Sequence, residues 1–272
     1  MKARILVDNV TKSDLKPEWG LSVWIEYEGH SILLDTGASG LFAENAEAMG
    51  ISISKAEFAV LSHAHYDHGD GLDCFFEQNP AAKVYLQKGI QENCYSRNDG
   101  PFEKYIGLKK GLLSQYADRF CYVEGAFSPV PGVTLLSHTT PGLEKTGERA
   151  GMLRWENGGW RPDDFRHEQS LIFETGSGLV IFNSCSHAGV DCIIKETAAA
   201  FPGKHIEALI GGFHLFRSTD GEVRSLAERI RETGIRRLYT DHCTGDRAME
   251  ILKEEFGDQI EQLYTGMEIE IP

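Results

Sequence analysis

Residues 61–70 of this 272-residue chain have the sequence Leu-Ser-His-Ala-His-Tyr-Asp-His-Gly-Asp. An apolar run leads into them and glycine follows, a pattern typical of a strand that ends in a loop. Side chains alternate along an extended segment, so His63 and His65 face the same way and can reach one metal ion. Asp67 and His68 follow where the chain turns into a helix, and they can reach a second ion. A solvated polar turn is the alternative, but three of the ten histidines of the chain lie within residues 63–68.

Composition limits the partners of the chain. Its formal net charge is −14, so its long-range field repels polyanions, which argues against nucleic acid and anionic membrane as partners. No apolar stretch approaches the roughly 20 residues that a membrane span needs. The N-terminal residues lack the features of a signal peptide, and a chain of this size needs no disulfides to stabilise it. We therefore expect a cytoplasmic protein whose six cysteines are free thiols.

Strand-like and helix-like patterns alternate through both halves of the chain, and no linker separates them. This organisation predicts a single domain of residues 1–272, in which two sheets lie face to face with helices outside. The expected strands are 4–7, 21–27, 31–34, 58–61, 83–86, 133–136, 170–174, 179–182, 206–210 and 237–239, with terminal strand material in 262–271. The expected helices are 40–49, a short one after residue 70, 190–200, 222–232 and 247–256.

The pattern weakens between residues 89 and 125, where aromatic and basic side chains are mixed. We interpret this segment as an insertion of irregular or helical character. It is either a lid that shapes the substrate site or a peripheral helical pair with its own small core.

Two motifs make the chain resemble the metallo-β-lactamase superfamily: the His-x-His-x-Asp-His signature at 63–68 and the Asp-Thr-Gly turn at 35–37. The resemblance covers nearly the whole chain. It implies an α/β fold, an αβ/βα four-layer sandwich with two central mixed β-sheets, helices on the outer faces and a two-metal site at one edge. In this family position, Asp35 would lie beneath the site and orient a ligand through a hydrogen bond.

Three later histidines each follow a predicted strand, and strand ends at one edge of a sheet converge. We interpret His187 and His242 as metal ligands, with helix capping or packing as the alternative. His214 is assigned a catalytic role at the substrate, with metal ligation and charge stabilisation left open. Asp67 is assigned two roles, as a metal ligand and as the catalytic acceptor of a proton from the attacking water.

The chain departs from the superfamily pattern at two places. A common histidine ligand follows Pro-Gly, but here Leu143 follows Pro141-Gly142. A common bridging aspartate is replaced by Cys185. We expect His187 to substitute for the missing histidine and Cys185 to pack as a small apolar residue, with thiolate ligation as the alternative. His138 is interpreted as part of a surface turn, with an approach to the site as the alternative.

The segments Cys-Ser-His-Ala-Gly, Gly-Gly-Phe-His-Leu and His-Cys-Thr-Gly are similar to a narrower, dihydropteroate-synthase-like branch. That branch is named for the synthase that joins a dihydropterin to ribofuranosylaminobenzene phosphate. The resemblance implies a metal-dependent hydrolase or phosphate-handling transferase that acts on a small anionic metabolite. Its cofactors would be two divalent transition metals, zinc first, with manganese or iron as alternatives.

Two other functions are open to this fold. A phosphodiesterase or nuclease is opposed by the acidic charge and by the lack of a basic stripe. A non-catalytic metal or ligand sensor is opposed by the complete signature at 63–68. Arg97, Lys104 and Arg166 are candidate phosphate contacts, with ordinary surface charge as the alternative.

Overall fold

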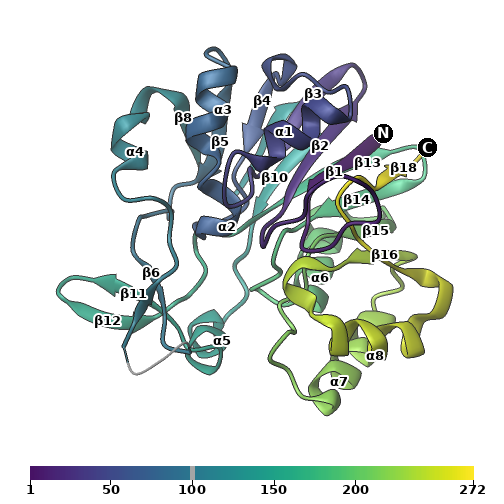
Figure 1. Ribbon diagram of the computed structural model, residues 1–272. Coiled ribbons are helices and arrows are strands. Elements are labelled where there is room, and N and C mark those ends of the chain that lie inside the picture. Colours follow the sequence, from purple (N-terminus) through teal and green to yellow (C-terminus); the bar gives the residue numbers. More distant parts are fainter. Residues whose placement is uncertain (99–101) are drawn as a thin grey trace.

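The computed structural model describes residues 1–98 and 102–272, and it contains two mixed sheets of seven strands each (Figure 1). The first sheet has antiparallel pairing at its β18-β1-β2-β3 side and parallel pairing from β3 to β8. In spatial order its strands are Glu268–Glu270 (β18), Lys2–Val7 (β1), Ser22–Tyr27 (β2), His30–Leu34 (β3), Phe58–Val60 (β4), Lys83–Gln87 (β5) and Phe120–Val123 (β8).

The second sheet is parallel on one side and antiparallel on the other. Strands β14 to β17 pair parallel, and β9, β10, β13 and β14 pair antiparallel. In spatial order its strands are Ile260–Gln262 (β17), Arg237–Thr240 (β16), Ile206–Ile210 (β15), Gly178–Phe182 (β14), Gln169–Thr175 (β13), Val133–Ser137 (β10) and Ala126–Val130 (β9).

Helices cover the outer faces of both sheets (Figure 1). No helix of the described residues has both the length and the apolar character that crossing a bilayer requires. The α-helices are Leu41–Ala48 (α1), Tyr66–Gly69 (α2), Leu72–Gln78 (α3), Leu112–Gln115 (α4), Leu143–Arg149 (α5), Val190–Ala200 (α6), Asp220–Arg231 (α7) and Asp246–Phe256 (α8). Short 3₁₀ turns are Ile53–Lys55, Ala117–Arg119, His242–Thr244 and Gly257–Gln259.

Alternating side chains build the layers. On β2, Ile25 packs between the two sheets, whereas Trp24 packs on the helix-covered side with α1 and α3. On β13, Phe173 points to the inter-sheet core and Ile172 to the core under α6, α7 and α8. Each sheet therefore buries both faces, as the two-residue period of a strand allows. The predicted αβ/βα four-layer sandwich is confirmed.

The functional loops follow the parallel strands at one edge of the sandwich. Strands β3 and β4 lead into Asp35 and the 61–68 loop, and β14, β15 and β16 lead into the loops that carry His187, His214 and His242. The two sheets meet here, since the Gln169 N–H donates to the Ser62 carbonyl over 2.9 Å.

The interpretation of residues 89–125 as irregular or helical is wrong in part. The segment does contain α4, but β8 joins the first main sheet, and two short strands form a third sheet with a hairpin further along the chain. Figure 1 shows this small sheet standing beside the sandwich near α5. The prediction failed because strands of two or three residues are too short to display a period. The third sheet consists of Gly159–Pro162 (β12), Met152–Glu156 (β11), Cys94–Ser96 (β6) and Lys104–Tyr105 (β7). Residues 99–101 of this segment lie outside the described residues.

Candidate metal centre

The loop after β4 brings the signature histidines into one buried cluster. His63, His65 and His68 are each at most 4% exposed. The His63 ring centroid lies 4.6 Å from that of His65 and 4.2 Å from that of His68. Asp67, in the first turn of α2, is also buried. The local geometry follows from the sequence, because the extended segment turns into a helix within these few residues.

Asp35 orients two of these imidazoles, as the sequence analysis expects. Its Oδ2 accepts hydrogen bonds from His68 Nδ1 (2.8 Å) and from Ser62 Oγ (2.6 Å). Because the Ser62 hydroxyl donates to Asp35, its oxygen accepts from His63 Nδ1 over 2.8 Å. Both rings therefore carry their proton on Nδ1, which leaves the Nε2 lone pairs free to bind a cation.

His242 is fixed in the same tautomer from the opposite sheet. Its Nδ1 lies 3.2 Å from Asn9 Oδ1. The Asn9 amide is oriented by two contacts, since its Oδ1 accepts the Gly20 N–H and its Nδ2 donates to the His242 carbonyl. His242 Nδ1 must then be the donor, and its Nε2 keeps a lone pair.

Two ring nitrogens thus face each other, because His242 Nε2 lies 3.1 Å from His68 Nε2, and either a proton or a metal ion must lie between them. Asp67 Oδ2 lies 3.6 Å from His242 Nε2 and 3.8 Å from His68 Nε2. Two atoms bound to one tetrahedral zinc ion are separated by about 3.3–3.8 Å, given bonds of about 2.0–2.3 Å. A metal ion between these three groups would be bound by two imidazole nitrogens and one carboxylate oxygen.

His187 lies on the other side of the cluster. Its ring centroid is 5.0 Å from that of His63 and 4.9 Å from that of His65. Both of its ring nitrogens are buried, and neither has a hydrogen-bond partner among the described residues; the same holds for Nε2 of His63 and of His65. Buried polar atoms without partners are costly, so these nitrogens fit a site for a metal ion.

Cys185 lies where the two groups of histidines meet. Its Sγ is within 4.8 Å of ligand atoms of His63 and His187 on one side and of His68 and His242 on the other. The distance from Sγ to His68 Nε2 is 3.2 Å. The thiol is buried, as a packing role predicts, and it also lies within reach of both groups of histidines, so ligation stands as the alternative. Burial raises the pKa of Cys185, so a thiolate here requires a cation beside it.

His214 faces the cluster from the loop after β15. Its ring centroid is 4.5 Å from that of His187, and its Nδ1 is buried without a hydrogen-bond partner among the described residues. Its backbone has a φ of 51°, and its N–H donates to Cys243 Sγ over 3.2 Å. The strained backbone holds the imidazole at the pocket, where either a substrate or an ion is within reach.

Burial sets the protonation state of the cluster. It lowers the pKa of His63, His65 and His187 well below the usual range, with the neighbouring imidazoles adding to the effect. It lowers the pKa of His242 to about 3. Burial also acts to lower the pKa of His68, but the carboxylates of Asp67 and Asp35 outweigh it and raise that pKa. Four of the histidines are thus neutral at pH 7, the form that binds metals.

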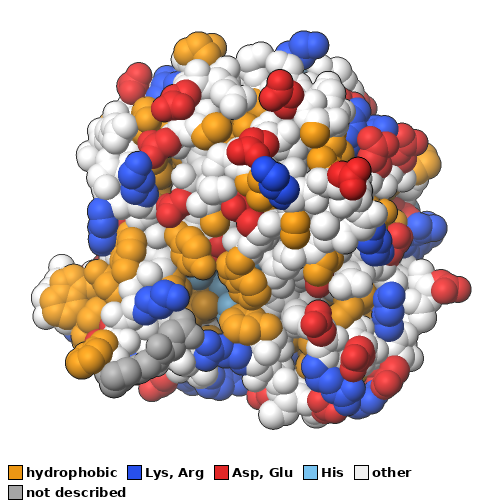
Figure 2. All heavy atoms as spheres, viewed as in Figure 1, with side chains coloured by type: hydrophobic (Ala, Val, Ile, Leu, Met, Phe, Trp, Pro, Cys, Tyr) orange, Lys and Arg blue, Asp and Glu red, His pale blue; other side chains and the backbone are white. Residues whose placement is uncertain are grey.

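A pocket of about 680 Å³ opens onto the cluster. Figure 2 shows a pale-blue histidine surface at the base of a hollow that hydrophobic side chains surround, with Lys and Arg side chains beside it. Aromatic side chains of Trp19, Phe165 and Phe216 line the pocket, which suits a planar ring in the ligand. The side chains it shares with the cluster are His65, Asp67, Cys185, His187 and His214.

The three candidate phosphate contacts differ in position. Lys104 lines the pocket, together with Arg149 and Arg217, which the sequence analysis did not single out. Arg97 and Arg166 form ion pairs with neighbouring acidic residues and are not among the described residues that line the pocket.

The expectation of a surface turn at His138 is wrong. His138 is buried, and it links Glu196 of α6 at 2.8 Å to Ser170 of β13 at 2.9 Å. Strand β10 carries it under α6, so it joins the helix to the sheet. The sequence also gave no indication of Asn9 as a partner of His242, because a loop residue more than 200 positions away has no spacing signal.

Comparison with known proteins agrees with this geometry. The sequence profile of the metallo-beta-lactamase superfamily matches residues 17–156. A relative from Methanocaldococcus jannaschii, 7,8-dihydropterin-6-methyl-4-(beta-D-ribofuranosyl)-aminobenzene-5'-phosphate synthase, is 27% identical, and the match covers 92% of this chain and 90% of that protein.

Solved structures extend the comparison. Tm1679, described as a metal-dependent hydrolase of the beta-lactamase superfamily, is 31% identical with a TM-score of 0.86, covering 100% of this chain and 99% of that one. A diphosphatase of the PhnP family shares the fold, with a TM-score of 0.58 at 16% identity over 100% of this chain and 98% of that one. The sequence profile and the relatives agree with the sandwich fold and the histidine cluster. The chain therefore belongs to the metallo-β-lactamase superfamily.

Proposed function

We propose that this protein is a two-metal enzyme that acts on a small, phosphate-bearing metabolite, with a reaction of the dihydropterin–ribofuranosylaminobenzene phosphate synthase type. The observation that carries the proposal is the approach of two buried imidazole nitrogens, His68 Nε2 and His242 Nε2, to 3.1 Å. Without a proton or a metal ion between them this contact is repulsive, and the hydrogen bonds on both Nδ1 atoms keep the rings from relieving it by a change of tautomer.

The residues present fit two divalent ions. One ion would be held by His63, His65 and His187, and the other by Asp67, His68 and His242. Cys185 lies between the two sets and replaces the bridging carboxylate of other superfamily members. Neutral imidazoles, a carboxylate and a thiolate favour zinc, with iron or manganese as alternatives. When bound, such ions polarise phosphoryl oxygens and lower the pKa of bound water.

The chain's own groups supply positioning and proton transfer. Asp67 is within reach of the reacting centre and can accept a proton from the attacking group. His214 faces the pocket from the opposite side and can donate a hydrogen bond to charge that develops on a leaving group. The aromatic side chains of Trp19 and Phe165 would contact a planar ring of the substrate.

In the synthase-type reaction, an arylamine nitrogen forms a bond to the pterin methylene carbon, the bond to pyrophosphate breaks, and the amine loses a proton. The similarity to the relative from Methanocaldococcus jannaschii supports this reading. Hydrolysis of a phosphoric anhydride is the second candidate, supported by the relative Tm1679, described as a metal-dependent hydrolase. The same centre would serve it, with water in place of the amine.

The first experiment tests the centre. Purified protein should contain about two transition-metal ions per chain, and His65→Ala should lose at least one. The exposed His205, distant from the cluster in the fold, provides the matched control, and His205→Ala should retain both ions. Equal metal content in all three proteins would contradict the proposed ligand set.

The second experiment tests the reaction. A dihydropterin methyl pyrophosphate is supplied with and without ribofuranosylaminobenzene phosphate, and pyrophosphate release is measured. Release that depends on the amine supports the synthase type, and release of phosphate from anhydrides without it supports hydrolysis. Tight binding of one metabolite without turnover of any phosphoric anhydride, phosphodiester, lactone or thioester would instead support a sensor.

A further inference from the structure

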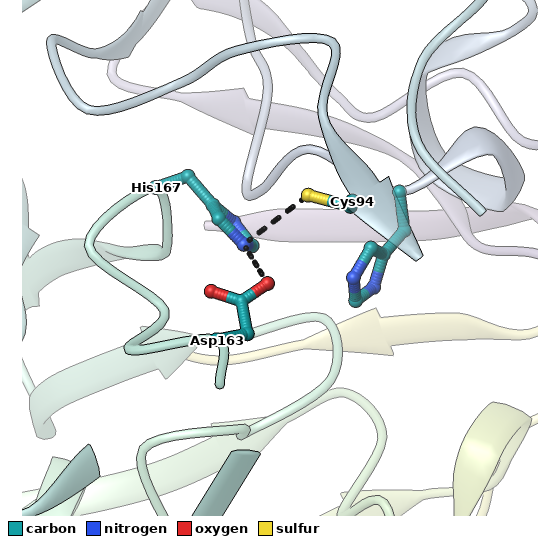
Figure 3. A group of neighbouring side chains, drawn as sticks. Cys94, Asp163 and His167 are labelled. Atoms are coloured by element: carbon teal, nitrogen blue, oxygen red, sulfur yellow. Dashed lines mark hydrogen bonds and ion pairs between the residues drawn. The ribbon is translucent and has the colours of Figure 1, made fainter. Parts of the chain in front are cut away.

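The segment 163–169 before β13 places a second buried polar group beside the metal centre. Figure 3 shows Cys94, Asp163 and His167 pointing toward one another from different parts of the chain. All three are at most 1% exposed. One nitrogen, oxygen or sulfur atom from each lies within 4.8 Å of the others and of a ring nitrogen of His65. Nothing in the proposed reaction uses them, although burial of such groups is costly.

The ring of His167 decides between an ion site and a set of hydrogen bonds. The Ala64 N–H donates to His167 Nδ1 over 3.2 Å, so Nδ1 keeps its lone pair. The proton of the ring then lies on Nε2, which faces Asp163 Oδ2 at 3.2 Å and Cys94 Sγ at 3.7 Å (Figure 3). A protonated Nε2 does not bind a metal ion. The group is therefore a chain of hydrogen bonds from Asp163 through His167 to the backbone of Ala64.

Ala64 lies between the ligands His63 and His65, so this chain of hydrogen bonds fixes the loop at its centre. Asp163 is itself held firmly, since its Oδ1 accepts the Phe165 N–H over 2.9 Å and Arg154 Nε lies 3.3 Å away. Burial alone would raise the pKa of Asp163, but His167, followed by His65 and the Phe165 N–H, outweighs burial and lowers that pKa to about 2, so the carboxylate is ionised.

The same segment also holds the loop that carries His187. Phe165 has a φ of 49°, which is rare for a bulky residue, and its ring stacks on the His187 ring with centroids 4.6 Å apart and planes 3° apart. The two carboxylate oxygens of Glu168 accept the N–H groups of His187 and Ala188 over 2.8 and 2.9 Å. One short segment therefore contacts two ligand-bearing loops from different sheets.

Gln169 completes the contacts on the side of the first sheet. Its N–H donates to the Ser62 carbonyl, and its Nε2 donates to the Leu61 carbonyl, each over 2.9 Å. With Ala64, three backbone groups within residues 61–64 thus bond to the segment. Such partners set the orientation of metal ligands without touching the ion.

We propose that residues 163–169 form a positioning template, in which Asp163 and His167 set the spacing of the His63–His65 loop relative to the His187 loop. The proposal rests on the two-metal centre proposed above. Asp163 and His167 are positioning residues: they act on the ion only through the backbone that carries its ligands. This role accounts for an ionised carboxylate and an imidazole that are fully buried outside the reaction pocket.

The test compares His167→Leu, which removes the acceptor of the Ala64 N–H, with His167→Asn, whose side-chain oxygen can replace Nδ1. Hydrogen exchange at the Ala64 amide is measured in metal-free protein, and metal affinity by competition with a chelator. We expect His167→Leu to speed exchange at Ala64 by at least about tenfold and to weaken metal binding about 10- to 100-fold. His167→Asn should restore most of the slow exchange at Ala64 and most of the metal affinity. Leu252→Ala, in the core that α8 covers, is the control. We expect it to lower the thermal stability by a similar amount while exchange at Ala64 and metal affinity stay normal.

Two results would overturn the template. The first is exchange at Ala64 and metal affinity in His167→Leu equal to those of the Leu252→Ala control. The second is a metal content of three ions in the unmodified protein that falls to two in Cys94→Ser, because the group would then hold an ion of its own. The exchange measurement needs no metal, so a protein that binds no ion would refute the proposed function while the template is still decided by exchange at Ala64.

Discussion

Replacing His242 by asparagine should make the metal-free protein less sensitive to acid. In that protein burial lowers the pKa of His242 to about 3, whereas histidine in the unfolded chain titrates near 6.5. Between these values the unfolded chain takes up a proton that the folded protein does not. The free energy of unfolding therefore falls as the pH drops below 6.5, and the loss from this residue ends near pH 3.

The size of the effect follows from the two pKa values. Each pH unit below 6.5 costs about 1.4 kcal/mol for one such histidine, so the loss at pH 5 is about 2 kcal/mol relative to pH 7.5. His63, His65 and His187 act in the same direction, because their pKa values are also lowered. His68 acts in the opposite direction, because its pKa is raised. Removing His242 should thus reduce the pH dependence of the unfolding free energy without abolishing it.

Urea unfolding of chelator-treated protein at pH 7.5, 6 and 5, followed by tryptophan fluorescence, measures this. The difference in unfolding free energy between His242→Asn and the unmodified protein should shift by about 2 kcal/mol in favour of the variant between pH 7.5 and pH 5. Leu252→Ala is the control, since an apolar truncation costs about the same at every pH. A His242→Asn difference that stays constant over this range would refute the assignment of a buried, neutral imidazole.

Three further outcomes are expected. Ser62→Ala, which removes the acceptor of the His63 Nδ1 proton, should weaken metal binding about 10- to 100-fold in chelator competition. Unchanged affinity would contradict the role of Ser62 in orienting His63. Gly71→Ala should abolish folding or lower the melting temperature sharply, because its Cβ would lie 2.3 Å from the Thr36 carbonyl oxygen, whereas Gly221→Ala, with nothing within 4 Å, should raise it slightly. Zinc at about 1,000 times its dissociation constant should stabilise the folded protein by about 4 kcal/mol, and a melting temperature that does not respond to zinc and chelator would contradict the metal centre.

Much of the sandwich could be predicted because its elements carry strong local signals. The bounds of α6 and β15 agree with the prediction to the residue, and the β13–β14 hairpin follows from its Gly-Ser-Gly turn. These segments are five residues or longer, or are flanked by clear turn residues. The hydrophobic period and the turn residues therefore indicate the same boundaries.

The third sheet was missed although one signal for it was present. Asn157-Gly158 joins β11 to β12, and both residues have positive φ, 52° and 78°. This dipeptide is a strong indication of a two-residue hairpin turn between alternating segments. Strands β6 and β7 could not have been found in this way, because both are very short and β6 joins β11 through a long-range contact that spacing does not encode, while β7 pairs with β6.

The candidate site was predictable to the extent that ligands cluster in sequence or follow strands. His63, His65 and His68 are close by spacing, and His187 and His242 meet them because parallel strands end at one edge. The partners that fix the tautomers were not predictable, apart from the carboxylate after β3. A side chain that bonds to a backbone amide, as His167 does with Ala64, leaves no pattern in the sequence.

Charge explains how an acidic chain can favour an anionic substrate. The proposed ligand set would carry two negative charges, one on the Asp67 carboxylate and one on the Cys185 thiolate. Burial keeps four of its histidines neutral, and His68 would bind a metal ion only in its neutral form. Two divalent ions would leave a net charge of +2 at the base of a pocket whose wall also includes Lys104. A small anion that enters the pocket is attracted at short range, where burial strengthens the interaction. A polyanion too large to enter would meet only the field of a chain with a net charge of −14, so the proposed site would favour a phosphate-bearing metabolite over nucleic acid.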